Sequence, residues 1–296
     1  MRHVRPSFRG APPASGTSPG STASSGISNR TWFVCFALDD SGPDDSGLDD
    51  SGLDDFGLGD AAPMTEARRH ALVGLGVGCL VTLLLVVVPR TLPDKYGATV
   101  IGGLFLAATW LFVWRKDDGT LREHGLELGG LVVPGTRPLA IARRGLRAAA
   151  FALVCAAVVF VPFTFGFFYW FKPKGHYTFP FDALGLGREL VLQIALVAFP
   201  EEAFYRGFLQ TNLARAEGPR VRLLGADIGL SLLATSVLFA LGHFATIPVP
   251  TRLAVFFPSL LFGWLRVRTG GIGASVFLHA LCNVFSESLG RGFGLY

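Results

Sequence analysis

Apolar residues gather into long blocks over most of the chain, and charged or Pro/Gly-containing segments separate them. A transmembrane helix needs about 20 mainly apolar residues. The pattern therefore predicts spans at 71–89, 97–114, 146–171, 189–213, 226–246, 251–265 and 270–289. The sixth block is short and contains proline, which predicts a broken or re-entrant helix, and residues 126–135 are a candidate for an eighth membrane-associated piece. We expect an all-α, polytopic integral membrane protein with about seven to eight transmembrane helices.

Composition supports the membrane class. Half of the 296 residues are hydrophobic and 16% are charged, whereas a soluble domain has about 25% charged residues. The expected environment is therefore a lipid bilayer, and no nucleic-acid partner is expected.

The first 63 residues differ from the rest. A Pro/Ser/Gly-rich stretch is followed by an aspartate-rich repeat of five residues at 39–58, and such segments cannot bury enough apolar surface to fold. We expect 1–63 to be a disordered leader, with Met64 as the more plausible start, and 64–296 to be the helical membrane domain. The leader holds four Arg and nine Asp, so that the remainder carries 22 basic and 13 acidic residues. The basic residues concentrate at 115–147, 215–222 and 266–268, which the positive-inside rule places in the cytoplasm.

A few polar side chains interrupt the predicted spans, although ionisable groups at membrane depth are costly and usually face the bundle interior. They are Glu201, Glu202 and Arg206 in the fourth span, His243 in the fifth, and His279 and Asn283 in the seventh. Glu202 and Arg206 are spaced i, i+4, which predicts an ion pair on one helix face. His279 and Asn283 have the same spacing, which predicts one polar face on their helix. Glu201 is turned about 100° away from Glu202 and has no partner on its own helix. These positions predict a buried polar cavity between three helices.

Each feature taken alone also has a purely structural interpretation. Glu202 and Arg206 can neutralise each other, a lone His243 or His279 is more often a satisfied core histidine, and Asn283 can be an interhelical hydrogen-bonding residue. Their coincidence in three spans favours a functional cavity.

Three short motifs carry a resemblance to a known family. EEAFYR (201–206) fits EExxxR, FALGH (239–243) fits FxxxH, and HALCN (279–283) fits HxxxN. In this order the chain resembles the CAAX protease and bacteriocin-processing (CPBP or Abi) family of intramembrane glutamic endopeptidases, over roughly residues 120–290, with the motifs within 189–289.

The resemblance implies catalytic roles and no cofactor. Glu201 would be the general base that activates water, assisted by His243. His279 and Asn283 would stabilise the oxyanion, with Glu202 and Arg206 as structural support of the site.

The chemistry is also reasonable from the residues themselves. Burial can move a carboxylate towards the basicity that amide hydrolysis needs, imidazole and amide groups can donate to an oxyanion, and no serine or cysteine stands in a recognisable nucleophile setting.

Two alternatives remain open. Two histidines and a carboxylate are also a catalytic zinc-ligand set, although no HExxH motif is present. A non-enzymatic transporter or bacteriocin-immunity protein would use the same cavity for binding; the hydropathy pattern lacks the internal repeat of many transporters.

The expected location is the inner membrane of a bacterium, since the Ala/Gly/Arg-rich sequence looks bacterial. The expected partners are the bilayer and a protein or peptide substrate with a hydrophobic or membrane-anchored tail, such as an exported protein or a peptide precursor. From the predicted span directions, the site is expected in the central to outer part of the membrane.

Overall fold

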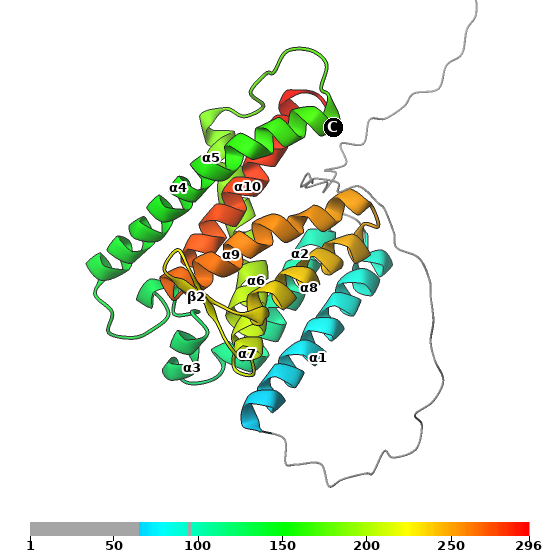
Figure 1. Cartoon of the computed structure of the whole chain (residues 1–296). Coiled ribbons are helices and arrows are strands. Elements are labelled where there is room, and N and C mark those ends of the chain that lie inside the picture. The colour runs from blue at the N-terminus through cyan, green and yellow to red at the C-terminus, as the bar shows by residue number, and fades with distance from the viewer. Residues whose placement is uncertain (1–64, 94–95, 296) are drawn as a thin grey trace, which may run out of the picture.

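The computed structural model describes residues 65–93 and 96–295, which form a helical bundle with one small β-hairpin (Figure 1). The predicted leader and the start at Met64 lie outside these residues. In chain order the elements are α1 (Glu66–Val87), η1 (Val88–Thr91), α2 (Gly97–Thr109), η3 (Trp110–Trp114), α3 (Asp118–Glu123), η4 (Leu128–Gly130), α4 (Pro138–Phe171), α5 (Ala183–Leu192), η5 (Gln193–Ala198), α6 (Phe199–Glu202), η6 (Ala203–Gln210), α7 (Thr211–Ala214), β1 (Val221–Leu223), β2 (Ala226–Ile228), α8 (Leu230–Thr246), η7 (Pro250–Val255), α9 (Phe256–Thr269) and α10 (Gly273–Gly292).

Each of the seven predicted spans has a helix in the structure, which confirms the all-α membrane class. By length and composition, four helical stretches of the described chain can cross a membrane: Glu66–Thr91, Gly97–Trp114, Pro138–Phe171 and Ala183–Ala214. The last three helices are shorter or more polar, with 17 residues in α8, 14 in α9 and 20 in α10. The protein is thus a multi-pass membrane protein.

Several predicted boundaries were wrong. The third and fourth spans begin earlier, at Pro138 and Ala183. The fifth begins at Leu230, because 226–228 pairs with 221–223 as an antiparallel hairpin. The sixth, which was predicted to be broken or re-entrant, is a 3-10 turn, η7, followed by α9.

The candidate eighth membrane piece at 126–135 is not a spanning helix. Its short 3-10 turn, η4, includes Gly129 at φ 69° and Gly130 at φ 96°. Left-handed backbone of this kind suits glycine and ends a helix.

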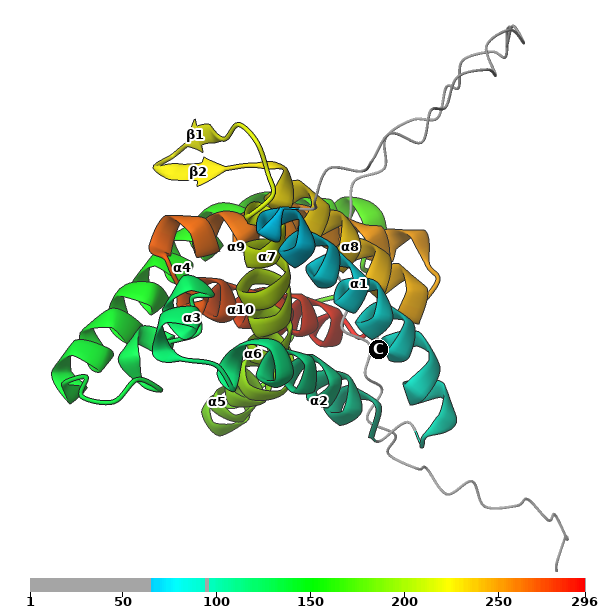
Figure 2. The ribbon, with the colours of Figure 1, turned by 90° about the horizontal axis from the view of Figure 1, so that it is seen from below.

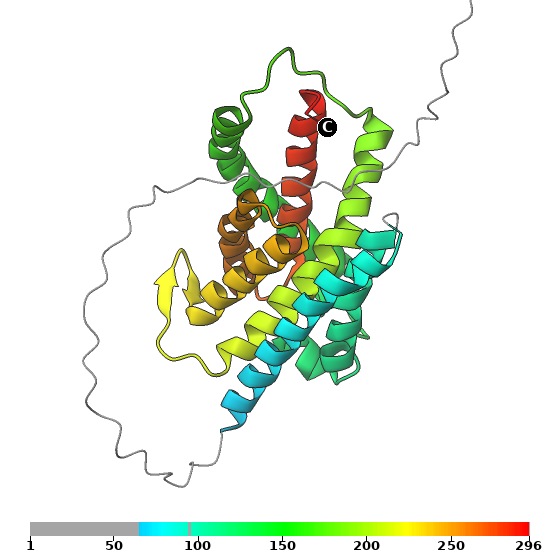
Figure 3. The ribbon, with the colours of Figure 1, turned by 90° about the vertical axis from the view of Figure 1, so that its right-hand side faces the viewer.

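Helix α10 lies inside the bundle, between α4 and α5 and close to α9 (Figure 3). The segment after α4 crosses the C-terminal end of α10. There the Tyr177 hydroxyl is 2.6 Å from Ser288 Oγ, and the Thr178 N–H donates to the Gly292 carbonyl at 3.0 Å. The polar residues of α10 are therefore shielded from lipid by neighbouring helices.

Basic residues collect at one end of the bundle, as the positive-inside rule requires of cytoplasmic loops. Glu123 accepts from Arg215 at 2.7 Å through its carboxylate and from Arg266 at 2.7 Å through its carbonyl. The hairpin β1–β2 projects beside this end (Figure 2). At the end of α1 remote from it, Arg90 donates to the carbonyl of Ala245 at 3.3 Å.

Candidate active site

The helix that carries the first motif changes its winding on both sides of the glutamates. It is π-helical at 193–198 and again at 203–210, around the short α6. Pro200 has no N–H to donate to the Leu196 carbonyl, and this carbonyl lies so close to α2 that a Cβ on Gly102 would be 2.8 Å from it. π-Helical turns are frequent at functional sites, and here they flank Glu201 and Glu202 on both sides.

Glu202 and Arg206 form the predicted ion pair. Arg206 Nη1 lies 3.0 Å from Glu202 Oε1, and both side chains are buried, at 1% and 0% exposure. Arg206 Nη2 also donates to Ser259 Oγ at 2.7 Å and to the Ser259 carbonyl at 3.2 Å. The guanidinium lies 4.6 Å from the Phe239 ring centroid and 5.3 Å from that of Phe262. The carboxylate, the two hydrogen bonds of Nη2 and the aromatic faces compensate this buried charge, although Nε and Nη1 have no hydrogen-bond partner among the described residues.

His279 lies between the two glutamates. Its Nδ1 is 2.9 Å from Glu202 Oε1, and its Nε2 is 3.8 Å from Glu201 Oε2. The ring stacks on Phe262, with centroids 4.8 Å apart and planes 13° apart. A carboxylate can only accept, so Nδ1 carries a proton and Nε2 faces Glu201.

His243 approaches from α8. Its Nδ1 donates to the Phe239 carbonyl at 3.0 Å, which leaves Nε2 available. The Phe239 ring is 4.4 Å from the His243 ring and 6.0 Å from that of His279, centroid to centroid. The structure thus places both histidines against one aromatic ring.

Asn283 is one helical turn beyond His279 and is equally buried. Its Nδ2 donates to Gln193 Oε1 at 3.0 Å, and Gln193 Nε2 donates to Glu189 Oε1 at 3.0 Å. Asn283 is therefore held by a chain of polar groups on the Glu201 helix, and one of its two amide protons remains available.

Sequence reasoning missed three residues of this region. Gln193 holds Asn283, Ser259 holds Arg206, and Arg252 of η7 is buried close enough to Glu201 for the two charges to attract. Each was visible as a polar residue inside an apolar run. Their partners are distant in sequence: Asn283 lies 90 positions from Gln193, Arg206 lies 53 from Ser259, and Glu201 lies 51 from Arg252. Only the fold brings these residues together.

The cluster does not have the arrangement of a metal site. Among residues 65–93 and 96–295, no three His, Cys, Asp or Glu side chains are placed to hold one ion. One nitrogen of each histidine is engaged, by Glu202 and by the Phe239 carbonyl respectively, as is usual for histidines that bind a metal through the other nitrogen. The cofactor-free mechanism and the zinc alternative both stay predictions.

Comparison with known proteins places this region in a family. The model described as "Type II CAAX prenyl endopeptidase Rce1-like" matches residues 183–285, which include all three motifs. Curated proteins and solved structures gave no match. Residues 183–285 of this multi-pass membrane protein therefore match an Rce1-like domain, in agreement with the CAAX-protease family that the motifs resemble.

Proposed function

We propose that the chain is an intramembrane endopeptidase of glutamic type, in which Glu201 activates the water that cleaves a peptide bond. The observation that carries the proposal is the difference between the two adjacent glutamates. In both glutamates Oε2 is buried without a hydrogen-bond partner among the described residues. The difference is that Glu202 Oε1 meets Arg206 and His279, whereas Glu201 Oε2 faces His279 Nε2 at 3.8 Å.

The proposed reaction begins with attack by water on the carbonyl carbon of the substrate. Glu201 accepts a proton from that water, and His243 Nε2 orients it. The new carbon–oxygen bond converts the carbonyl to a tetrahedral oxyanion. His279 Nε2 and the available N–H of Asn283 would donate to that oxyanion.

Collapse of the intermediate breaks the carbon–nitrogen bond. The proton held by Glu201 passes to the departing amine, so the carboxylate is restored. Glu202 and Arg206 take no part in proton transfer and keep His279 in position. A carboxylate that cycles in this way needs no metal, and we propose a cofactor-free enzyme.

The proposed substrate is the hydrophobic or membrane-anchored tail of a protein or peptide precursor in a bacterial inner membrane. The support is the position of the cluster, which lies on helices that cross the bundle and is surrounded by apolar side chains such as Phe204, Phe239 and Phe262.

The proposal is tested by cleavage in cells and in vitro. Membrane-protein tails are compared by mass spectrometry between a deletion strain and strains that express wild type or Glu201→Gln; tails found shortened with wild type are then made as peptides for the purified protein. Loss of the general base should lower kcat/KM about 10²-fold or more.

The matched control is Glu287→Gln, which makes the same change on α10, where Glu287 pairs with Arg291 instead of with the cluster. It should retain cleavage. If wild type and Glu201→Gln give the same tails, the protein is not a protease acting through Glu201, and the transporter or immunity alternative gains ground.

A further inference from the structure

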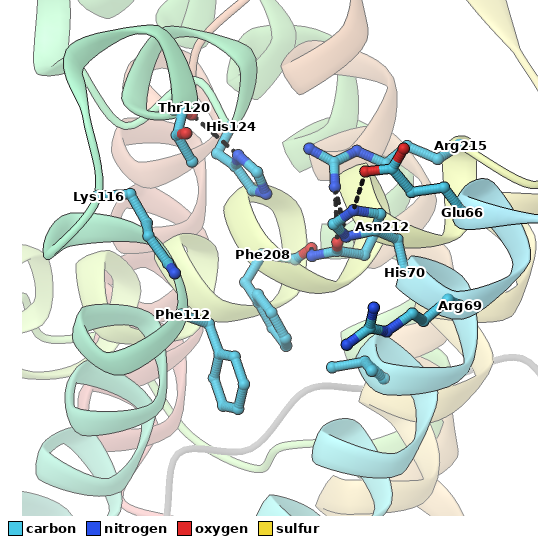
Figure 4. A pocket seen from close by; sticks show the side chains of 11 residues that line it. Glu66, Arg69, His70, Phe112, Lys116, Thr120, His124, Phe208, Asn212 and Arg215 are labelled. Carbon is cyan, nitrogen blue, oxygen red and sulfur yellow. Dashed lines mark hydrogen bonds and ion pairs between the residues drawn. The ribbon is translucent and has the colours of Figure 1, made fainter.

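A cavity of about 500 Å³ opens at the basic end of the bundle, apart from the candidate active site (Figure 4). It lies between the first turns of α1, the end of η3, and α7, and none of the seven motif residues lines it. Its walls include Arg69, Lys116, His124, Arg215, Phe112 and Phe208.

The cavity carries more positive charge than its own residues neutralise. Arg215 is paired with Glu123 at 2.7 Å, and Glu66 lies 3.6 Å from His70. Arg69 and Lys116 form no ion pair with any residue in the described ranges. In Figure 4 their side chains extend into the cavity from opposite walls. Two cations facing one space favour a ligand with negative charge between them.

Part of the lining is apolar and meets the outer surface of the bundle. Phe112 and Phe208 lie with ring centroids 5.2 Å apart. Val73, also in the wall, is 43% exposed, and its neighbour Leu72 is 57% exposed. On a membrane-spanning helix such side chains face acyl chains, so the cavity is continuous with the lipid phase.

His124 adds a polar group of defined character. It is 3% exposed, and its Nδ1 donates to the Thr120 carbonyl at 2.9 Å. Burial and the nearby Arg215 lower the pKa of His124, so the imidazole is neutral at pH 7 and Nε2 can accept a hydrogen bond. A ligand hydroxyl would suit this atom.

We propose that this cavity binds a phosphate ester, supplied by the headgroup of an anionic phospholipid of the cytoplasmic leaflet. The phosphate lies between Arg69 and Lys116, a headgroup hydroxyl donates to His124, and an acyl chain runs along Val73 and Phe112. Basic pockets between transmembrane helices on the cytoplasmic side are known to bind anionic headgroups. The proposal does not depend on the peptidase assignment.

The test uses the full chain, purified in a neutral detergent. Thermal unfolding and native mass spectrometry are recorded with phosphatidylglycerol, with phosphatidylcholine and with soluble glycerol 3-phosphate. The site variant is Arg69→Gln with Lys116→Gln. The matched control is Arg143→Gln with Arg147→Gln, which removes two exposed cations from the basic end of α4.

We expect phosphatidylglycerol to bind and to raise Tm by several degrees, phosphatidylcholine not to, and the site variant to bind at least tenfold more weakly than the control. Native mass spectrometry reports binding even where the variant is less stable. Equal binding of the two lipids, or equal losses in the site variant and the control, would overturn the proposal. Saturation by glycerol 3-phosphate at similar concentration would overturn the lipid assignment, because a free phosphate ester would then be the ligand.

Discussion

At the scale of single residues, the site shows how adjacent glutamates acquire different roles. Glu202 and Arg206 are i, i+4 neighbours, and the pair is completed by Ser259 and His279 from other helices. Glu201 Oε2 faces His279 Nε2 at 3.8 Å. A compensated charge suits a structural role, and an under-compensated one suits chemistry.

The first prediction concerns these two glutamates. Glu202→Gln and Arg206→Met should each destabilise the protein by about 3–5 kcal/mol, because each strands the remaining charge of a buried pair. Glu201→Gln should leave Tm nearly unchanged and lower kcat/KM about 10²-fold or more. Differential scanning fluorimetry in detergent measures the first effect and peptide cleavage the second. Equal loss of stability in all three variants would mean that Glu201 is structural as well.

Gln193 gives a second prediction, which rests on the proposed function. Gln193→Leu removes the acceptor that holds Asn283 Nδ2, so the amide of Asn283 should no longer be oriented. If Asn283 acts on the transition state, kcat should fall about tenfold or more while KM stays nearly constant. Gln193→Glu keeps an acceptor oxygen and should recover part of the rate. A change in KM alone would show that Gln193 serves substrate binding.

Metal dependence is a third prediction. With Glu201 as the base, prolonged incubation with EDTA or o-phenanthroline should leave cleavage intact. Loss of activity that added zinc restores would favour the zinc alternative over the metal-free mechanism.

At the scale of elements, the helix from Ala183 to Ala214 depends on its fit against α2. The carbonyl of Leu196, without a donor from Pro200, lies against Gly102. Gly103, its neighbour in sequence, has open space at the position of a Cβ. The two glycines form a natural comparison within one helix.

The fourth prediction uses that comparison. Gly103→Ala should be neutral or stabilising by up to about 1 kcal/mol, because alanine loses less entropy in a helix. Gly102→Ala should destabilise by about 1–3 kcal/mol, because the methyl group would push the π-helical segment away from α2. Thermal unfolding of both variants measures the difference. Equal effects of the two substitutions on Tm would show that the close packing of Leu196 on Gly102 does not contribute to stability.

The sequence predicted what depends on local spacing, and missed what depends on packing between distant segments. The i, i+4 geometry of Glu202 and Arg206 was enough to predict their pair, and hydropathy located all seven helices. The sixth span was predicted to be broken or re-entrant because it contains proline, but the 3-10 turn η7 that begins at Pro250 was not predicted. The contact of Gln193 with Asn283 joins residues 90 positions apart, and no local pattern encodes it.

At the scale of the whole molecule, the distribution of charge orients the bundle. The basic end of the bundle contains the starts of α1 and α4 and the ends of α7 and α9. At the opposite end, where α1 and α8 finish, Arg90 donates to the carbonyl of Ala245. The Glu201 helix begins at Ala183, six residues before the predicted span. At 1.5 Å per residue, Glu201 is about 27 Å from Ala183 and about 20 Å from Ala214. The site therefore lies near the middle of its helix, and less far towards the outer side than the sequence predicted.

The last prediction fixes this orientation. Single cysteines at Pro248 and Gly218, both exposed and at opposite ends of the bundle, are introduced into a cysteine-free background. Because the basic loops should remain in the cytoplasm, a membrane-impermeant maleimide should label Pro248→Cys on intact spheroplasts, and should label Gly218→Cys only after the membrane is broken. Cells that process a known tail serve as the control for folding. The reverse pattern would turn the protein over in the membrane, placing the cavity of Arg69 and Lys116 on the outer leaflet and presenting the active site to substrates from the opposite side.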